Sequence, residues 1–536
     1  MGDMERAKEK SRGMLSGLWD WMDRHSRFLL TFLLLGYFLL FSAASIFKLE
    51  ALRQGFDLAG NEQTLWNTMH GRLFQTSVFF PTMRYDFDDG PVLLQLPLAG
   101  LYALYPSPYT LLILQTAVIA LGALPLYGLA RDLWGRPGAG LVAAALYLLH
   151  PTVQHINLYE FQYRSFTMTF ALYAFYFFER RKYAWWALFL LLGMATKTES
   201  ALLAVSFGLY ALLRRRPWGY VWPPIVVGGL WFYLALFVVA PHFTLGGSSF
   251  VAGIYSYGYL GDSFGEILHT LVTRPLFVLS QLFWPEKVQF LGQMLFLCAF
   301  LPLLSPRELL LPAPIFFLNL LSPNPVQFSL YYQYQGLTVP FLLIAMLYGL
   351  HRLQRLLAGR GENLRPGEDR RPGVLQTSLL LLLLFGLANC LFWNNALWST
   401  WRRQDTPQRI ADARVVVARV PADAPLAASN FLAPFVARRE GLYFFPGNRS
   451  YPFRICRGPS GDPSCPEEYF VPADYLLTDT SETLPEAGRE MLRRFLAEGS
   501  WEVMVRQGDF ILLRRVENRW ETVLQPEGFV LLRPAK

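Results

Sequence analysis

The sequence predicts a mostly α-helical membrane protein, a bundle of about eleven spans with a small α/β domain at its C-terminal end. Hydrophobic residues make up 53% of the 536 residues and charged residues only 16%, which is too apolar for a soluble protein of this size. Apolar runs long enough to cross a bilayer recur as far as about residue 400. Beyond that point, short stretches of alternating apolar and polar residues predict strands.

The first apolar run extends from Phe28 to Phe47 and follows a polar, basic leader, residues 1–26. We expect this leader to be cytoplasmic, because positive charges are retained on the cytoplasmic side during insertion. A cleaved signal peptide is the competing interpretation. The run is longer than the apolar part of a signal peptide, which favours a retained anchor.

The remaining spans of a transmembrane domain, residues 27–399, are expected at ten further apolar runs, near residues 109–130, 138–155, 165–179, 183–197, 200–213, 219–240, 276–304, 309–322, 336–350 and 375–397. The run 91–105 is short for a span and contains Pro97. It is therefore interpreted as an interfacial or re-entrant helix inside a first outer loop, residues 49–108.

Basic clusters between the runs fix the predicted orientation. With 91–105 excluded as a span, nearly all Arg clusters fall on the cytoplasmic side: residues 130–136, 179–182, 214–218, 305–308 and 351–373. This distribution accounts for the net charge of +8 and argues against nucleic-acid binding. The protein is predicted to be a multi-pass protein of the cytoplasmic (inner) membrane, with its N-terminus inside and its C-terminal domain outside.

The C-terminal region, residues 400–536, is predicted to be a soluble α/β domain outside the membrane. Strands are expected within 424–431, 441–447, 473–479 and 503–516, and an amphipathic helix within 485–500. Cys456 and Cys465 bracket a Gly/Pro turn, and a disulfide between them is expected in an oxidising compartment. Two unpaired thiols are the alternative.

Acids, amides, histidines and tyrosines concentrate in the predicted outer loops. Ionisable groups near a membrane are costly and usually mark a function. A polar cluster on one side of the bilayer therefore points to chemistry at the outer face.

Several phrases resemble a family of predicted bacterial and archaeal membrane proteins that share a domain of unknown function and are similar to the GT-C class of lipid-dependent glycosyltransferases. They are "GFDLAGNEQTLWNTMHGRLF" (55–74), "YEFQYRS" (159–165), "TKTES" (196–200) and "VPADAPLAASNFLAPFVARREGLYFFPG" (420–447). The resemblance implies a GT-C-like fold and transfer of a sugar from a polyprenyl-phosphate donor to an acceptor outside the cytoplasmic membrane. It also implies that an acid in the first outer loop acts as base, a position that Asp57 matches.

Two acids lie within residues 55–67, Asp57 and Glu62. An inverting sugar transfer needs a carboxylate to accept the proton of the acceptor, and Asp57 is the candidate, with Glu62 as secondary support. Five residues correspond to about 500° around a helix, so the two acids converge only if the chain bends between them, near residues 58–60. Alternatively, Asp57 only caps the following helix.

An acidic turn, "RYDFDDG" (84–90), supplies Arg84, Asp86, Asp88 and Asp89. Asp86 and Asp88 form a pattern that can hold a divalent cation, while Arg84, Asp88 and Asp89 are candidate substrate-binding residues. A solvated turn would look the same. No other cofactor is predicted.

The chain departs from the family's pattern at residues 161–164 and 197–199, where members tend to show Phe-His-Pro-Glu and Lys-Glu-Asp. Here Gln162 and Arg164 cannot act as bases. Arg164 could instead bind a phosphate, and Lys197 could add a second positive charge, with Glu160 or Glu199 as its partner. A snorkelling Arg and a structural ion pair are the alternatives.

Tyr331, Tyr332 and Tyr334 offer a stacking surface for a sugar, or an interfacial aromatic belt. Three classes of function remain: a glycosyltransferase, a non-catalytic scaffold or lipid- or glycan-binding subunit of a cell-envelope complex, and a transporter. The predicted partners are a polyprenyl-phosphate lipid, membrane lipids and, for the second class, other subunits of a membrane complex.

Overall fold

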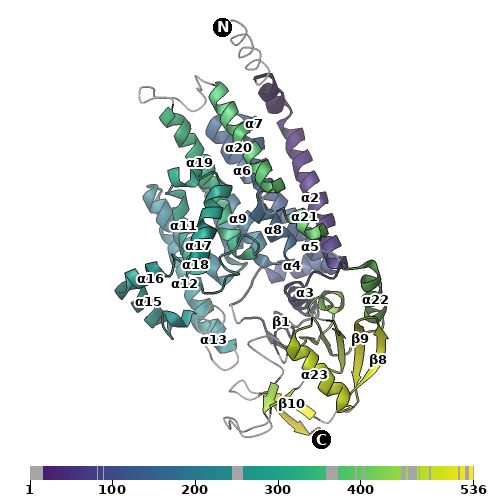
Figure 1. The fold of residues 1–536 in the computed structure, drawn as a ribbon. Coiled ribbons are helices and arrows are strands. Elements are labelled where there is room, and N and C mark those ends of the chain that lie inside the picture. Colours follow the sequence, from purple (N-terminus) through teal and green to yellow (C-terminus); the bar gives the residue numbers. More distant parts are fainter. Residues whose placement is uncertain are drawn as a thin grey trace.

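The computed structural model describes residues 16–80, 83–87, 90–243, 257–357, 372–392, 395–402 and 405–447, and beyond them 454–456, 467–469, 471, 473–481, 484–516, 520–524 and 530–534. Figure 1 shows a helical bundle above and a domain with a mixed sheet below, with helices α3 (Phe56–Met69) and α4 (Gln95–Tyr102) between them. The predicted class, mostly helical with a C-terminal mixed sheet, is confirmed.

Within the described part of the chain, four helices are long and apolar enough to cross a membrane: α2 (Ser26–Glu50) and the longer stretches Pro108–Trp134, Trp218–Phe243 and Val374–Arg402. These stretches include α5 (Pro108–Leu121), α6 (Ala123–Trp134), α12 (Trp222–Tyr233), α13 (Ala240–Phe243), α20 (Pro372–Phe392) and α21 (Ala396–Arg402). The count of about eleven spans stays a prediction.

Shorter helices fill the rest of the bundle, and most predicted apolar runs coincide with one. They are α7 (Pro137–Leu149), α8 (Pro151–Leu158), α9 (Tyr163–Glu179), α10 (Tyr183–Met194), α11 (Ala201–Leu213), α15 (Phe264–Thr273), α16 (Pro275–Ser280), α17 (Pro285–Leu297), α18 (Ala313–Leu321) and α19 (Val339–Leu357). Small residues bring some of them close together. A side chain added at Gly140 on α7 would come within 2.7 Å of the Tyr127 backbone on α6, so the glycine permits this contact.

The C-terminal domain is built on a five-stranded sheet in the order β4-β3-β7-β9-β8. Strand β3 (Leu426–Ala428) runs parallel to β4 (Leu442–Phe444) and to β7 (Tyr475–Asp479). Strand β9 (Phe510–Arg515) is antiparallel to β7 and to β8 (Trp501–Gln507). Helices α22 (Pro407–Val417) and α23 (Glu486–Ala497) complete the domain, and these elements lie in or beside the predicted stretches.

In the described part of the chain, three separate two-stranded sheets lie outside this five-stranded sheet. They pair β1 (Gln75–Thr76) with β2 (Arg84–Tyr85), β5 (Arg454–Cys456) with β6 (Glu467–Tyr469), and β10 (Trp520–Leu524) with β11 (Val530–Pro534). Cys465 lies outside the described residues, so the proposed disulfide with Cys456 stays a prediction. Cys298 and Cys390 are buried free thiols.

The loop between α2 and α5 packs directly on the C-terminal domain. The backbone N–H of Phe444 donates to the Val78 carbonyl (3.2 Å), and Ser77 Oγ exchanges hydrogen bonds with the Leu442 backbone (2.7 and 2.9 Å). The loop therefore covers the edge strand β4, whose backbone groups would otherwise lack partners. Gln63 on α3 strengthens the contact by donating to the Glu440 carbonyl (2.6 Å).

Candidate functional site

Asp57 is the second residue of α3, and its carboxyl does not cap that helix. The N-cap is Gly55. The N–H of Phe56 donates to Asn430 Oδ1 (2.9 Å), and the N–H of Leu58 donates to Glu160 Oε2 (3.0 Å). Since distant side chains satisfy these N–H groups, the Asp57 carboxyl is left to interact elsewhere, and it accepts a hydrogen bond from the Tyr159 hydroxyl (3.2 Å).

The connection between α8 and α9, residues 159–162, carries most of the groups around Asp57. Lys48 Nζ donates to the carbonyls of Leu158 (2.7 Å) and Tyr159 (2.6 Å). Buried Gln115 donates to the Asn157 and Glu160 carbonyls (3.1 and 3.0 Å) and accepts from the Gln162 N–H (2.8 Å). Polar side chains from two apolar helices thus fix this irregular backbone, as buried polar backbone groups require.

Two positive charges face the Asp57 carboxyl. Burial raises the pKa of Asp57 above its usual value, while the hydrogen bond from Tyr159, the charges of Lys197 and Arg164, and a hydrogen bond from Gln162 lower it. Burial therefore destabilises the charged form of Asp57, and the nearby positive charges partly offset this effect. Such a combination is typical of catalytic carboxyl groups, whose pKa is shifted upward from its usual value.

Glu160 is the second acid at this point. Burial and the charge of Asp57 raise the pKa of Glu160, while the N–H groups of Leu58 and Gly55 and the charge of Lys48 lower it. The two carboxyls thus titrate as a pair, with Glu160 bound to the helix N-terminus and Asp57 turned toward the basic groups.

Arg164 and Glu199 form an ion pair, with Arg164 Nη2 and Nε each 2.5 Å from Glu199 Oε1 and with only 12% and 11% of the two side chains exposed. The guanidinium also lies 4.7 Å from the centre of the Tyr334 ring. Glu199 is therefore the partner of Arg164, whereas Lys197 contributes its charge at Asp57. A small cavity of about 10 Å³ lies among Arg164, Glu199 and Tyr334.

The candidate tyrosines divide between two places. The Tyr332 ring packs on Tyr159 at 5.2 Å, beside Asp57. Tyr331 is 47% exposed and packs on His155 at 4.8 Å.

Gly90, the last residue of the acidic turn, lies close to the segment that carries Lys197. A side chain at Gly90 would lie 2.2 Å from Thr198 Oγ1, and the Leu94 N–H donates to the Ala195 carbonyl (2.9 Å). Gly90 and Leu94 therefore lie against the segment that carries Lys197 and Glu199. Arg84 lies over the Phe80 ring at 4.5 Å.

The metal prediction stays open at this turn. Asp88 and Asp89 lie outside the described residues. Among the residues that are described, which include Asp86, no group of three His, Cys, Asp or Glu side chains is placed to hold a metal ion.

Glu62 is not brought to Asp57. The helix α3 is continuous through both residues, so the bend that would make them converge is not present in it. Glu62 is fully buried and accepts a hydrogen bond from the Tyr102 hydroxyl of α4 (2.7 Å). Burial raises the pKa of Glu62 to about 8, although Tyr102 and the charge of Arg438 oppose the shift.

The structure thus gathers Asp57, Glu160, Gln162, Arg164, Lys197, Glu199 and Tyr332 from the sequence-based candidates. Sequence reasoning missed Tyr159, Lys48 and Gln115. The signal for the last two was a single polar side chain, directly after an apolar run for Lys48 and inside one for Gln115. A snorkelling residue or a core residue gives the same pattern.

Comparisons with known proteins identify a family and several similar solved structures, among them two structures of ArnT. No curated protein matches the sequence. The crystal structure of ArnT from Cupriavidus metallidurans bound to undecaprenyl phosphate is 13% identical, with a TM-score of 0.45, and the match covers 90% of this chain and 98% of that chain. The crystal structure of ArnT from Cupriavidus metallidurans in the apo state is 12% identical, with a TM-score of 0.41, and the match covers 85% of this chain and 92% of that chain.

The family comparison covers most of the chain. The profile of the predicted membrane protein family DUF2079 matches residues 48–512, from the end of α2 to β9. The protein therefore belongs to the DUF2079 family of predicted membrane proteins.

Proposed function

We propose that this protein transfers a sugar from a polyprenyl-phosphate donor to an acceptor hydroxyl at the outer face of the cytoplasmic membrane. The observation that carries the proposal is the Asp57 carboxyl, fixed by Tyr159 and Gln162 at the start of α3 and faced by Lys197 and Arg164. A base beside two cations is the arrangement that a displacement at a sugar phosphate requires.

In the proposed reaction, Asp57 takes the proton of the acceptor hydroxyl while the acceptor oxygen attacks the anomeric carbon. The bond between that carbon and the phosphate oxygen breaks, so the polyprenyl phosphate leaves with the bonding electrons and the anomeric configuration inverts. The reaction conserves the proton count, because the proton gained by Asp57 is returned to water after product release. The raised pKa of Asp57 suits a base that works near neutral pH.

Lys197 and Arg164 are proposed to bind the phosphate. Lys197 is the more direct candidate, because Arg164 is already paired with Glu199. That pair fixes the guanidinium plane over Tyr334, and an oriented guanidinium still presents N–H donors for a second anion. Both cations would stabilise the charge that develops on the leaving phosphate.

The test is turnover by the full chain in liposomes that contain polyprenyl-phosphate-linked hexose, pentose and amino-sugar donors together with a membrane-glycan extract. We expect release of free polyprenyl phosphate and glycosylated product, both measured by mass spectrometry. Asp57→Asn should lower the rate about 100-fold or more, since general base catalysis contributes 10²–10⁴-fold. Asp132→Asn, which alters an exposed ion pair with Arg180 at the end of α6, is the matched control and should keep full activity.

Unchanged turnover in Asp57→Asn would remove Asp57 as the base. Tight binding of the donors without turnover by the wild-type chain would instead favour a lipid- or glycan-binding subunit.

A further inference from the structure

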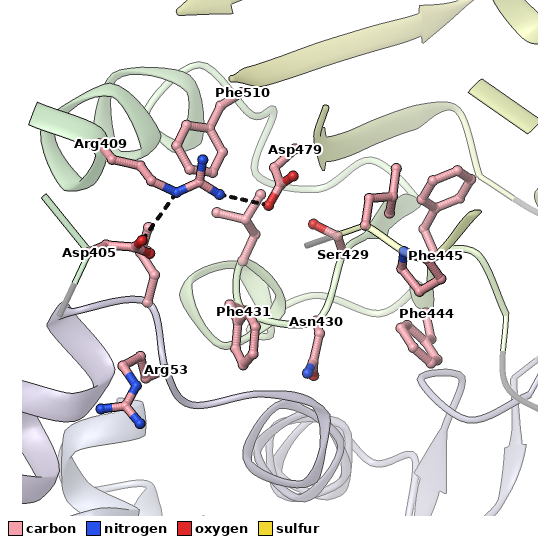
Figure 2. A pocket seen from close by; sticks show the side chains of 14 residues that line it. Arg53, Asp405, Arg409, Ser429, Asn430, Phe431, Phe444, Phe445, Asp479 and Phe510 are labelled. Atoms are coloured by element: carbon pink, nitrogen blue, oxygen red, sulfur yellow. Dashed lines mark hydrogen bonds and ion pairs between the residues drawn. The ribbon is translucent and has the colours of Figure 1, made fainter. Parts of the chain in front are cut away.

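A pocket of about 500 Å³ lies between the C-terminal domain and the loop that follows α2. Its volume is within the range of ligand sites, about 300–1,000 Å³. Figure 2 shows Arg409 and Asp405 on one side of it and Phe444 and Phe445 on the other. None of these four residues belongs to the site at Asp57.

The pocket lies where the topology of the sheet favours a ligand. After β3 the chain moves to β4 on one side, and after β7 it moves through α23 to the edge strand β8 on the other side. Ser429 and Asn430 directly follow β3, and Asp479 ends β7, so their side chains line the pocket at the carboxyl ends of two parallel strands. In open α/β sheets, ligands bind at this switch in strand order.

Among the described residues, four charged side chains line the pocket, and their formal charges cancel: Arg53 and Arg409 against Asp405 and Asp479. Arg409 contacts Asp479 (2.9 Å), Asp405 (3.4 Å) and Asp509. A phosphate or carboxylate placed against Arg409 would therefore meet three carboxylates, which repel it. A cation in the pocket would meet the guanidinium groups of Arg53 and Arg409, which repel it.

The walls combine apolar surfaces with hydrogen-bonding groups. Phe431, which is 39% exposed, and Phe444 present ring surfaces, while Ser429 and the ion-paired groups supply hydroxyl, carboxylate and guanidinium edges. A purely apolar ligand would desolvate those polar edges without replacing their hydrogen bonds, at a cost. A sugar ring matches both surfaces, because its C–H face is apolar and its rim carries hydroxyls.

The pocket and Asp57 share the first turn of α3. Asn430 Oδ1 accepts from the Phe56 N–H, and the Phe56 ring packs on Phe444. Gly55 permits this close approach, because a side chain there would lie 2.2 Å from Asn430 Oδ1. A ligand in the pocket is thus adjacent to the segment that positions the proposed base.

We propose that this pocket binds an uncharged saccharide, which serves as the acceptor of the transfer reaction; the acceptor role rests on the proposed function. The C-terminal domain then selects the acceptor, and the membrane domain supplies the donor and the base.

The experiment measures binding to the full chain in lipid nanodiscs by saturation-transfer difference NMR, without any donor. The probes are glucose, galactose, N-acetylglucosamine and maltose, with glucuronic acid and glucosamine as charged counterparts. We expect at least one neutral sugar to bind and to outcompete both charged ones. Phe431→Ala should weaken that binding about tenfold by removing one ring surface. Leu496→Ala, a similarly exposed position on α23 (42%), is the matched control.

Asp57→Asn separates the two proposals, because it should abolish turnover and leave sugar binding unchanged. The pocket proposal is overturned if no neutral sugar binds, if a charged sugar binds better, or if Phe431→Ala binds as well as wild type. Equal affinity in Leu496→Ala and in wild type supports it. A wild-type chain that transfers sugar but binds no neutral saccharide would overturn the pocket and leave the proposed function intact.

Discussion

Glu62 shows how strongly burial acts on a single carboxyl in this protein. It was a candidate for chemistry because it lies five residues from Asp57, but it is buried against Tyr102, and its pKa is raised to about 8 mainly by burial. Glu62 is therefore mainly protonated at neutral pH. We expect it to affect the stability of the folded protein and not the reaction.

The stability of the fold should depend on pH through Glu62. Between the usual carboxyl pKa, about 4.3, and the folded value, the folded protein holds one proton more than the unfolded chain, so stability falls as pH rises by up to about 1.4 kcal/mol per pH unit. Glu62→Gln removes this loss. We expect its Tm to exceed that of wild type by a margin that grows from pH 5 to pH 8, measured by thermal unfolding in detergent.

Exposed Glu498 at the end of α23 provides the control for this measurement. Glu498→Gln should show the wild-type pH dependence. A Tm difference between Glu62→Gln and wild type that stays constant from pH 5 to pH 8 would contradict a buried, protonated Glu62.

Lys197 is expected to act on the proton of Asp57. Its charge lowers the pKa of Asp57, so Lys197→Met should raise that pKa, and the acid limb of the kcat/KM profile should move to higher pH because less base is ionised at a given pH. The measurement is the pH profile of sugar transfer. Lys182→Met, an exposed position between α9 and α10, should leave the profile unchanged, and an unshifted acid limb in Lys197→Met would rule out this coupling.

At the scale of elements, the site depends on how one irregular segment lies against another. The sequence predicted helices well, because apolar runs and their lengths report them directly. It did not predict that Glu160 and Asn430, rather than Asp57, would satisfy the N–H groups of α3. Those partners come from positions about 100 and 370 residues away along the chain, and no local pattern encodes such a contact.

A substitution at Gly90 tests the contact between this residue and the segment that carries Lys197. Gly90 and Gly71 both have left-handed backbones, with φ of +81° and +83°, but a side chain at Gly90 meets Thr198 Oγ1 at 2.2 Å and one at Gly71 meets nothing within 4 Å. Gly90→Ala should therefore lose stability beyond the 1–2 kcal/mol that the backbone alone costs in both variants. It should also lower sugar-transfer activity.

Thermal unfolding and hydrogen exchange of residues 195–200 measure the difference between the two glycine variants. The double variant Gly90→Ala/Thr198→Ala removes the colliding hydroxyl and should return to the level of Gly71→Ala. Equal losses in Gly90→Ala and Gly71→Ala would mean that the turn does not rest on Thr198.

At the scale of the whole molecule, composition and hydropathy predicted the membrane bundle, and the change of pattern near residue 400 predicted the domain with a sheet. Of the candidate site, Asp57, Glu160, Arg164, Lys197 and Glu199 were named from sequence, because ionisable groups stand out in an apolar chain. The pocket at the ends of β3 and β7 was not predicted. It is formed by the packing of the C-terminal domain against the loop after α2, which no sequence pattern reports.

The pairing of Ser77 and Val78 with β4 has a consequence for how the protein is made. The ribosome produces the loop carrying Asp57 early and strand β4 some 365 residues later. Until that strand has been synthesised and has reached the same side of the membrane, the loop lacks the surface on which it rests. A chain released before β4 is made would contain the helices that precede β4, but its loop would lack the contact that holds Asp57 in place. The proposed site would therefore form only when synthesis has passed β4.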